Sequence, residues 1–121
     1  MPLGGSFIGG DSAAEFIEVP FTFATASPVA LGTRNSDEVI VRSEVVITTP
    51  FDGGTPSILL GTNVDPDMIL AAGEVKPKKI GQYQTHETFP EPASDENLEL
   101  TIVPSGSTAG AGYVTLTLWR P

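Results

Sequence analysis

The stretch GTNVDPDMILAAGEV, Gly61–Val75, holds the residues whose types and spacing come nearest to a cation site. Asp65 and Asp67 flank Pro66, so their carboxylates could bind a metal ion, or Asp65 could cap a helix that begins at Pro66. A calcium loop needs about six oxygen ligands at alternating positions and a late bidentate glutamate, which do not follow Asp67. We therefore expect a short helix that ends at Gly73.

The remaining ionisable residues do not make up a recognisable catalytic set. His86 is the single histidine and the chain has no cysteine, so a metal site lacks its usual ligands. A hydrolytic triad is not indicated, because no serine lies on a nucleophile elbow. Acidic pairs occur at Glu87 with Glu91 and at Asp95 with Glu96, in a segment whose prolines would leave the carboxyls loosely held. The glycines do not form a nucleotide-binding motif ahead of a helix. We expect neither an enzyme nor a bound cofactor or metal.

The charge balance excludes further classes of partner. The chain carries 15 acidic and 6 basic side chains, a formal net charge of −9, which repels phosphate backbones and anionic lipid. No apolar run is long enough for a membrane span, and the N-terminus lacks the pattern of a signal peptide. The sequence therefore predicts no nucleic acid and no membrane as partners.

A few residues are better suited to contacts with another protein. The lysines at 76–79 form the only basic cluster, which could protect a strand edge from aggregation or meet an acidic patch on a partner. Trp119 is expected on the outward face of the last strand, where an exposed tryptophan can anchor an interface. The candidate interface residues are Phe7, Ile8, Lys76, Lys78, Lys79, Tyr113 and Trp119.

The elements that position these residues are mostly strands. The 13 glycines and 11 prolines favour many short strands joined by turns. Apolar residues alternate with polar ones over residues 17–23, where Pro20 indicates a sheet edge or a bulge. Residues 38–49 predict the longest strand, with an apolar face made by Val39, Val41, Val45 and Ile47. On the last strand Val114, Leu116 and Leu118 should face inward.

Two glycine-rich segments are expected to close hairpins. TPFDGGTP, Thr49–Pro56, would use positive φ at Gly53 and Gly54, and PSGSTAGAG, Pro104–Gly112, would link the last two strands. Six to eight short strands predict an all-β fold, an antiparallel β-sandwich with one short helix, and leave open whether it is a jelly roll. Residues 1–14 are expected to form a flexible N-terminal arm, and residues 15–121 a single domain.

The order of these motifs resembles small structural proteins of tailed bacteriophages. The resemblance runs through VVITTPFDGGTPSILLGTNVDPDMILAAGEV, GQYQ and PSGSTAGAGYVTLTLW, roughly Val45–Trp119. It is carried by turn and cap positions: Thr48, Thr49, Phe51, Gly53, Gly61, Asp65, Pro66, Asp67, Thr108, Ala109, Gly110, Ala111 and Gly112.

The resemblance implies a non-enzymatic virion component, assembled in the host cytoplasm. The leading interpretation is a capsid decoration or cement protein that bridges and stabilises shell subunits, with the major capsid protein or other virion proteins as partners. A homo-oligomer, trimer or dimer, is expected. The alternative is a tail- or fibre-associated module that binds a receptor or carbohydrate, for which Tyr83, Tyr113 and Trp119 would have to converge.

Overall fold

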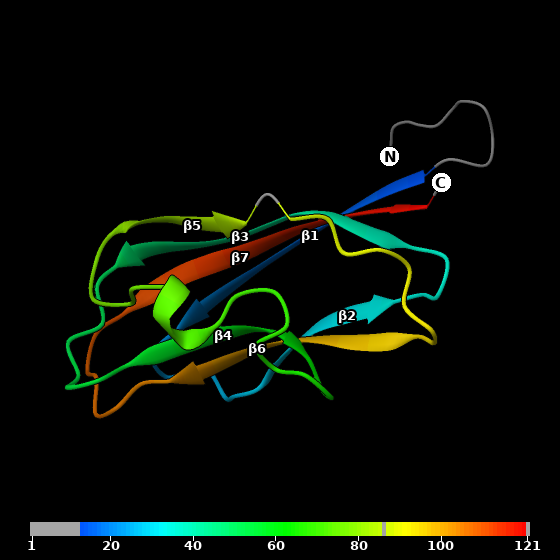
Figure 1. Ribbon diagram of the computed structural model, residues 1–121. Coiled ribbons are helices and arrows are strands. Elements are labelled where there is room, and N and C mark those ends of the chain that lie inside the picture. Colours follow the sequence, from blue (N-terminus) through cyan, green and yellow to red (C-terminus); the bar gives the residue numbers. More distant parts are fainter. Residues whose placement is uncertain (1–12, 86, 121) are drawn as a thin grey trace.

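The computed structural model describes residues 13–85 and 87–120, which form two antiparallel sheets packed face to face (Figure 1). One sheet has four strands in the order β1–β7–β3–β5, and the other has three in the order β2–β6–β4. The strands are β1 (Ala13–Thr22), β2 (Val29–Arg34), β3 (Val39–Thr49), β4 (Ser57–Thr62), β5 (Gly81–Thr85), β6 (Glu96–Val103) and β7 (Ala111–Arg120). The predicted all-β sandwich is confirmed. No helix within the described ranges is long and apolar enough to cross a membrane.

The core lies between the sheets and is centred on β6 and β7. The inward residues of β7, Val114, Leu116 and Leu118, are buried as predicted from the alternation. The equivalent residues of β6 are Leu98, Leu100 and Ile102, which are buried as well. Side chains two residues apart share one face of a strand, so both central strands present an unbroken apolar row to the opposite sheet.

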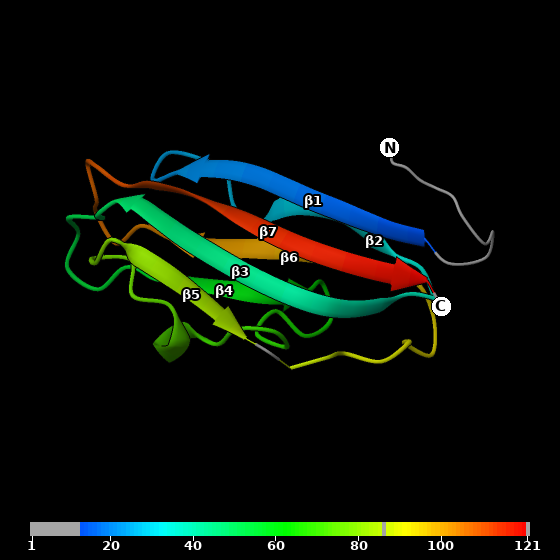
Figure 2. The ribbon, with the colours of Figure 1, turned by 90° about the horizontal axis from the view of Figure 1, so that it is seen from above.

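The expected position of β1 at a sheet edge is confirmed. β1 pairs only with β7, and Figure 2 shows it as the outer border of the four-stranded sheet. Pro20 lies in this border strand, where its missing N–H interrupts no ladder between two strands. The strand begins at Ala13, two residues inside the segment 1–14 that the sequence predicts as an arm; the rest of that segment lies outside the described residues.

The alternation predicted for β3 is wrong at its start. Ile40 is fully buried, and the register with β7 shifts between Ile40 and Arg42. Val41 is therefore the extra residue of a β-bulge, which changes which face the following side chains point to. Ile40 faces the core before the bulge, and Val45 and Ile47 face it after the bulge, so Val41 does not belong to the apolar row.

Both predicted hairpins are also wrong. The segment Thr49–Pro56 leads from β3 to β4, and the segment Pro104–Gly112 leads from β6 to β7, but the two strands of each pair lie in opposite sheets. Gly53 and Gly54 have no positive φ. Gly53 is needed for another reason: a Cβ there would overlap the carbonyl oxygens of Pro104 and Ser105. Each segment is a crossing between sheets rather than a two-strand turn.

The helix expected from Pro66 to Gly73 does not form. A turn at Pro66–Asp67 follows β4, and Leu70 then makes an isolated bridge with Leu60 in which each N–H donates to the other carbonyl. Thr62, not Asp65, is the capping residue, because its hydroxyl accepts the Asp65 N–H at 2.9 Å. So short a helix has little stability alone, whereas the bridge buries the apolar residues against the sheet. The described helix is a single 3-10 turn, Ala72–Glu74.

Arg34 joins the end of β2 to the long loop before β6. β2 ends at Arg34. The Arg34 side chain donates to Glu96 Oε1 from Nε at 3.0 Å and from Nη2 at 2.8 Å, and its Nη1 donates to the carbonyls of Phe89 and Pro90 at 2.9 Å. Phe89 also exchanges backbone hydrogen bonds with Ile40. The loop is thereby fixed to both sheets.

Candidate functional site

The outer face of the four-stranded sheet carries most of the candidate contact residues. Tyr113, Thr115, Thr117 and Trp119 point outward from β7, opposite to its buried residues. The strand register places Phe16 of β1 and Arg42 of β3 on either side of Thr117. In the same way Glu18 and Glu44 lie on either side of Thr115. This surface, called the outer face below, combines aromatic rings with both signs of charge.

A hollow of about 300 Å³ opens on the outer face. Thr115 and Thr117 form its floor, because their side chains are shorter than those of Phe16, Glu18, Arg42 and Glu44 on the flanking strands. Phe16 is 78% exposed, whereas Glu44 is only 9% exposed and accepts a long hydrogen bond of 3.4 Å from the Thr115 hydroxyl.

The aromatic residues named from the sequence do not converge. Trp119 is 44% exposed and shares the outer face with the half-buried Tyr113, but six residues of extended strand separate them by about 20 Å. Tyr83 points to the other side of its sheet, packs against the core, and donates its hydroxyl to the Lys79 carbonyl at 2.9 Å. The arrangement required for a three-ring carbohydrate platform is therefore not present in these residues.

The lysine cluster lies apart from Trp119. Lys76, Lys78 and Lys79 are exposed on a turn between the 3-10 helix and β5, closed by the Lys79 N–H donating to the Lys76 carbonyl at 3.0 Å. They precede an edge strand but are not part of one. β5 begins opposite Ile47, at the end of the sheet far from Trp119. Phe7 and Ile8 lie outside the described residues, as does His86.

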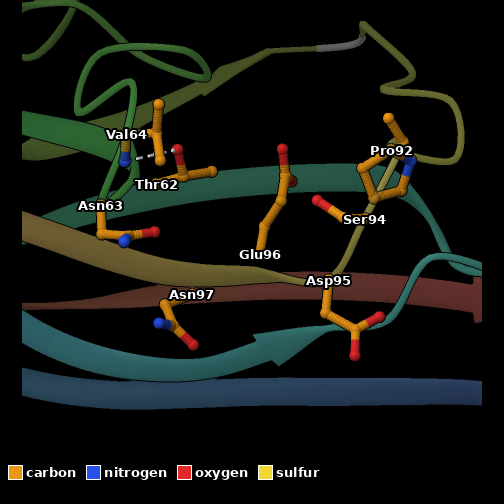
Figure 3. A pocket seen from close by; sticks show the side chains of 9 residues that line it. Thr62, Asn63, Val64, Pro92, Ser94, Asp95, Glu96 and Asn97 are labelled. Atoms are coloured by element: carbon orange, nitrogen blue, oxygen red, sulfur yellow. Dashed lines mark hydrogen bonds between the residues drawn. The ribbon is translucent and has the colours of Figure 1, made fainter.

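A second hollow of about 300 Å³ lies where β4 ends and β6 begins. It is lined by Thr62, Asn63, Val64, Pro92, Ala93, Ser94, Asp95, Glu96 and Asn97. In Figure 3 the Glu96 side chain lies between Thr62 and Ser94. Glu96 is neutralised by Arg34, and Asp95 accepts the Ser36 N–H at 2.8 Å, so these carboxylates already have partners within the fold. The hollow has hydrogen-bonding walls but no nucleophile paired with a base.

The two aspartates of the Gly61–Val75 stretch interact with each other. A side-chain hydrogen bond with Asp67, followed by burial and the negative charges of Asp67 and Glu96, raises the pKa of Asp65 above 3.8. The Asp65 carboxyl is therefore protonated more easily than that of an isolated aspartate. Within residues 13–85 and 87–120 no group of three histidine, aspartate or glutamate side chains is placed to hold a metal ion.

The loop motifs of the sequence meet at one end of the sandwich. We call the contact between residues 51–55 and 104–110 the loop junction. Asp52 Oδ1 accepts the N–H groups of Thr108 and Ala109 at 2.6 and 3.2 Å, and its Oδ2 accepts the Thr108 hydroxyl at 2.8 Å. Those bonds, led by the Thr108 hydroxyl, hold the pKa of Asp52 below 3.8. Ser107 Oγ accepts the Gly53 N–H at 2.8 Å. The motif residues therefore stabilise the fold at this junction.

Sequence reasoning missed Phe16, Glu18, Arg42 and Glu44 on the outer face. One signal was available, because Phe16 is a large apolar residue out of phase with the inward row Ile17, Val19 and Phe21. Glu18 lies in β1 and Arg42 and Glu44 lie in β3, so only the pairing of both strands with β7 brings them together. Nothing in the local sequence shows that Arg42 and Glu44 lie across β7 from Phe16 and Glu18.

No protein-family model and no curated protein matches the sequence. The fold is similar to a chain in the capsid asymmetric unit of cyanophage Pam1, with a TM-score of 0.70 and 11% identity over 100% of this chain and 94% of that one. It is equally similar to a chain in the acidic stable capsid of Helicobacter pylori bacteriophage KHP30, with a TM-score of 0.70 and 11% identity over 91% of this chain and 92% of that one. A chain of Bacillus endospore appendages aligns at a TM-score of 0.49 and 12% identity over 99% of this chain and 97% of that one. This likeness is too remote to support a conclusion about the present protein. The first two chains share their fold with this protein.

Proposed function

We propose that the protein is a structural component of a bacteriophage capsid, and more narrowly a decoration or cement protein that bridges and stabilises shell subunits. The observation that carries the proposal is the likeness to two capsid chains, which extends over 94% and 92% of their lengths. The sequence motifs point to the same class. The proposal assigns no catalytic role, and the outer face, with Phe16 and Trp119 exposed, is the surface we assign to contacts with other capsid proteins.

The strand order supports a jelly roll, one of the architectures used by viral capsid domains. Every strand is followed by a strand of the opposite sheet, in the orders β1–β7–β3–β5 and β2–β6–β4. The bridge between Leu60 and Leu70 places the residue 70 segment beside β4, at the free edge of the smaller sheet. We infer that this bridge occupies the place of an eighth strand.

Immunogold electron microscopy tests the capsid assignment. Antibodies against the purified protein are applied to phage particles from cells that carry its gene. Label distributed over the shell is the expected result. Label confined to the tail or fibres would support the alternative assignment. If neither labelling nor mass spectrometry detects the protein in the particles, the capsid role is overturned.

The cement role is tested separately by the stability of the shell. Particles produced without the protein are heated with a fluorescent DNA dye, and their DNA release is compared with that of complete particles. A cement protein adds contacts between subunits, so its loss should lower the release temperature, and adding the purified protein should restore it. Equal release temperatures would contradict a cement role and leave the protein a decoration.

A further inference from the structure

The outer edge of β1 offers backbone groups for pairing with another strand. β1 is ten residues long, pairs only with β7, and borders the four-stranded sheet (Figure 2). A long edge strand of this kind is a template for a further strand. Ala14, Phe16 and Glu18 are all exposed, and the Phe16 ring is the most exposed aromatic side chain described.

The hydrogen bonds show which groups face the open edge. The Phe23 N–H donates to the Gly110 carbonyl at 3.0 Å, and the continuous register of β1 with β7 places these residues opposite each other. Pairs that exchange hydrogen bonds alternate along antiparallel strands. The odd-numbered residues of β1 are therefore bonded to β7. The N–H and C=O groups of Ala14, Phe16 and Glu18 point away from it.

The open edge has a defined end. Pro20, the next even-numbered residue, has no N–H to offer. The Thr22 N–H is already bonded to Thr25 Oγ1 at 2.8 Å. In the described part of the chain, the N–H groups available to a further strand on β1 are thus confined to Ala14, Phe16 and Glu18.

This short edge is complementary to itself. If a two-fold axis passes beside Phe16, the Phe16 residues of the two copies form one hydrogen-bonded pair. Ala14 of each copy then pairs with Glu18 of the other copy, and each pair exchanges two hydrogen bonds. Every outward backbone group of the three residues finds a partner, and Pro20 falls outside them.

The side chains suit the same arrangement. The two Phe16 rings become direct cross-strand neighbours on the outer face, a pairing that stabilises sheets. Glu18 lies opposite Ala14 of the second copy, and Glu15 lies opposite Ile17. No two carboxylates lie directly opposite each other. Like charges in that position would destabilise the paired strands.

We propose that the protein forms a two-fold symmetric dimer in which the β1 strands of two copies pair antiparallel, centred on Phe16, and join the two four-stranded sheets into one. The proposal does not depend on the capsid role. Each copy carries a formal charge of −9, so the copies repel each other at long range. Added salt screens this repulsion, and dimerisation should strengthen with ionic strength.

Cysteine cross-linking reads the register directly, because the chain has no cysteine of its own. Phe16→Cys places two cysteines at a hydrogen-bonded pair with Cα atoms about 5.5 Å apart, within disulfide range. Glu18→Cys alone places them about 14 Å apart along the strands. We expect rapid oxidative cross-linking of Phe16→Cys, slow cross-linking of Ala14→Cys or Glu18→Cys alone, and rapid cross-linking when the last two are mixed.

A proline variant tests the hydrogen bonds in solution. Glu18→Pro removes an outward N–H and leaves the bonds to β7 intact, as Pro20 already does two residues further on. The dimer should dissociate at least about tenfold more easily, because two hydrogen bonds are lost per dimer. The control, Glu18→Gln, removes the charge, keeps the N–H and should dimerise at least as well as the parent.

Sedimentation of the full chain over a wide concentration range, at low and high ionic strength, completes the test. A monomer–dimer equilibrium that salt strengthens is expected. A monomer at every concentration, a trimer, or equal cross-linking of all three single-cysteine variants would overturn the proposal. So would a dimer that Glu18→Pro leaves unchanged, and so would pairing of β1 only with a strand of another protein.

Discussion

Arg34 is the residue on which the most contacts depend. The residue is only 2% exposed, and its guanidinium makes hydrogen bonds to one carboxylate and two backbone carbonyls. A planar guanidinium donates in several fixed directions at once, which an ammonium group cannot do. The partners come from β6 and from the loop at residues 89–90, so one side chain links β2 to a region more than 50 residues away in the sequence.

Replacing Arg34 by lysine should therefore be costly although the charge is kept. We expect Arg34→Lys to lower the free energy of unfolding by about 3 kcal/mol, because Glu96 and a buried carbonyl lose their donors. Urea denaturation followed by circular dichroism measures the change. Arg42→Lys, at an exposed position, is the matched control and should change stability little. Equal effects of the two variants would contradict the role given to Arg34.

Trp119 is the interface residue that the sequence singled out. If Trp119 anchors the contact with the shell, Trp119→Ala should weaken binding to particles that lack the protein by about 2 kcal/mol or more, roughly thirtyfold. Co-sedimentation with those particles gives the affinity. Val64→Ala removes apolar surface from a residue that is also exposed, away from the outer face, and serves as the control. Unchanged binding of Trp119→Ala would remove Trp119 from the interface.

Among the larger elements, the loop junction connects the two crossings between sheets. Asp52 is ionised there in the folded state, since its pKa lies below the usual 3.8. A carboxylate with a lowered folded pKa contributes stability that is fully present above the unfolded pKa and is lost as the pH falls through the folded pKa. The junction should accordingly weaken in acid.

Asp52→Asn should lower the melting temperature at neutral pH, and the difference from the parent should shrink as the pH falls below about 3.8. Thermal melts at a series of pH values measure it. The raised pKa of Asp65 has the opposite sign, because it favours the folded state as the pH falls, but it is common to both proteins and cancels in the difference. A difference independent of pH would show that the charge of Asp52 does not matter.

Gly110 belongs to the same junction. Its φ is +146°, and a Cβ there would come within 2.6 Å of the Phe51 ring. Gly110→Ala therefore adds a steric overlap to backbone strain, and we expect a loss of about 3 kcal/mol. Gly106 also has a positive φ but no atom near its absent Cβ, so Gly106→Ala should cost only about 1 kcal/mol. Equal losses in denaturant melts would contradict the overlap.

The elements show what could be predicted from the sequence. The alternation of β6 and β7 was sufficient because both strands lie at the centre of a sheet and one face is wholly apolar. The predicted hairpins failed because a glycine-rich segment looks the same whether it reverses within a sheet or crosses between sheets. The bulge at Val41 and the Asp52–Thr108 bonds depend on strand pairing. That pairing joins residues far apart in the chain and leaves no local signal.

At the scale of the whole molecule, the sandwich presents an acidic surface and no described metal cluster. The outer face of the four-stranded sheet is the surface we assign to capsid contacts, and the open edge of β1 is the one we assign to a second copy. Since they adjoin along β1, a dimer would double the outer face without covering Trp119. The two assignments are therefore compatible.

The alternation of strands between the sheets has a consequence for how the chain folds. No strand pairs with its neighbour in sequence, and Ala13 lies opposite Arg120, so nearly every ladder closes a large loop. Such a high contact order predicts refolding in milliseconds to seconds, and a microsecond phase in temperature-jump experiments that completes folding would contradict it. β6 and β7 follow all the other described strands in the sequence, so β3–β5 is the only strand pair that can form before β6 is synthesised. The nascent chain must keep its other strand edges from aggregating until β6 and β7 have been synthesised.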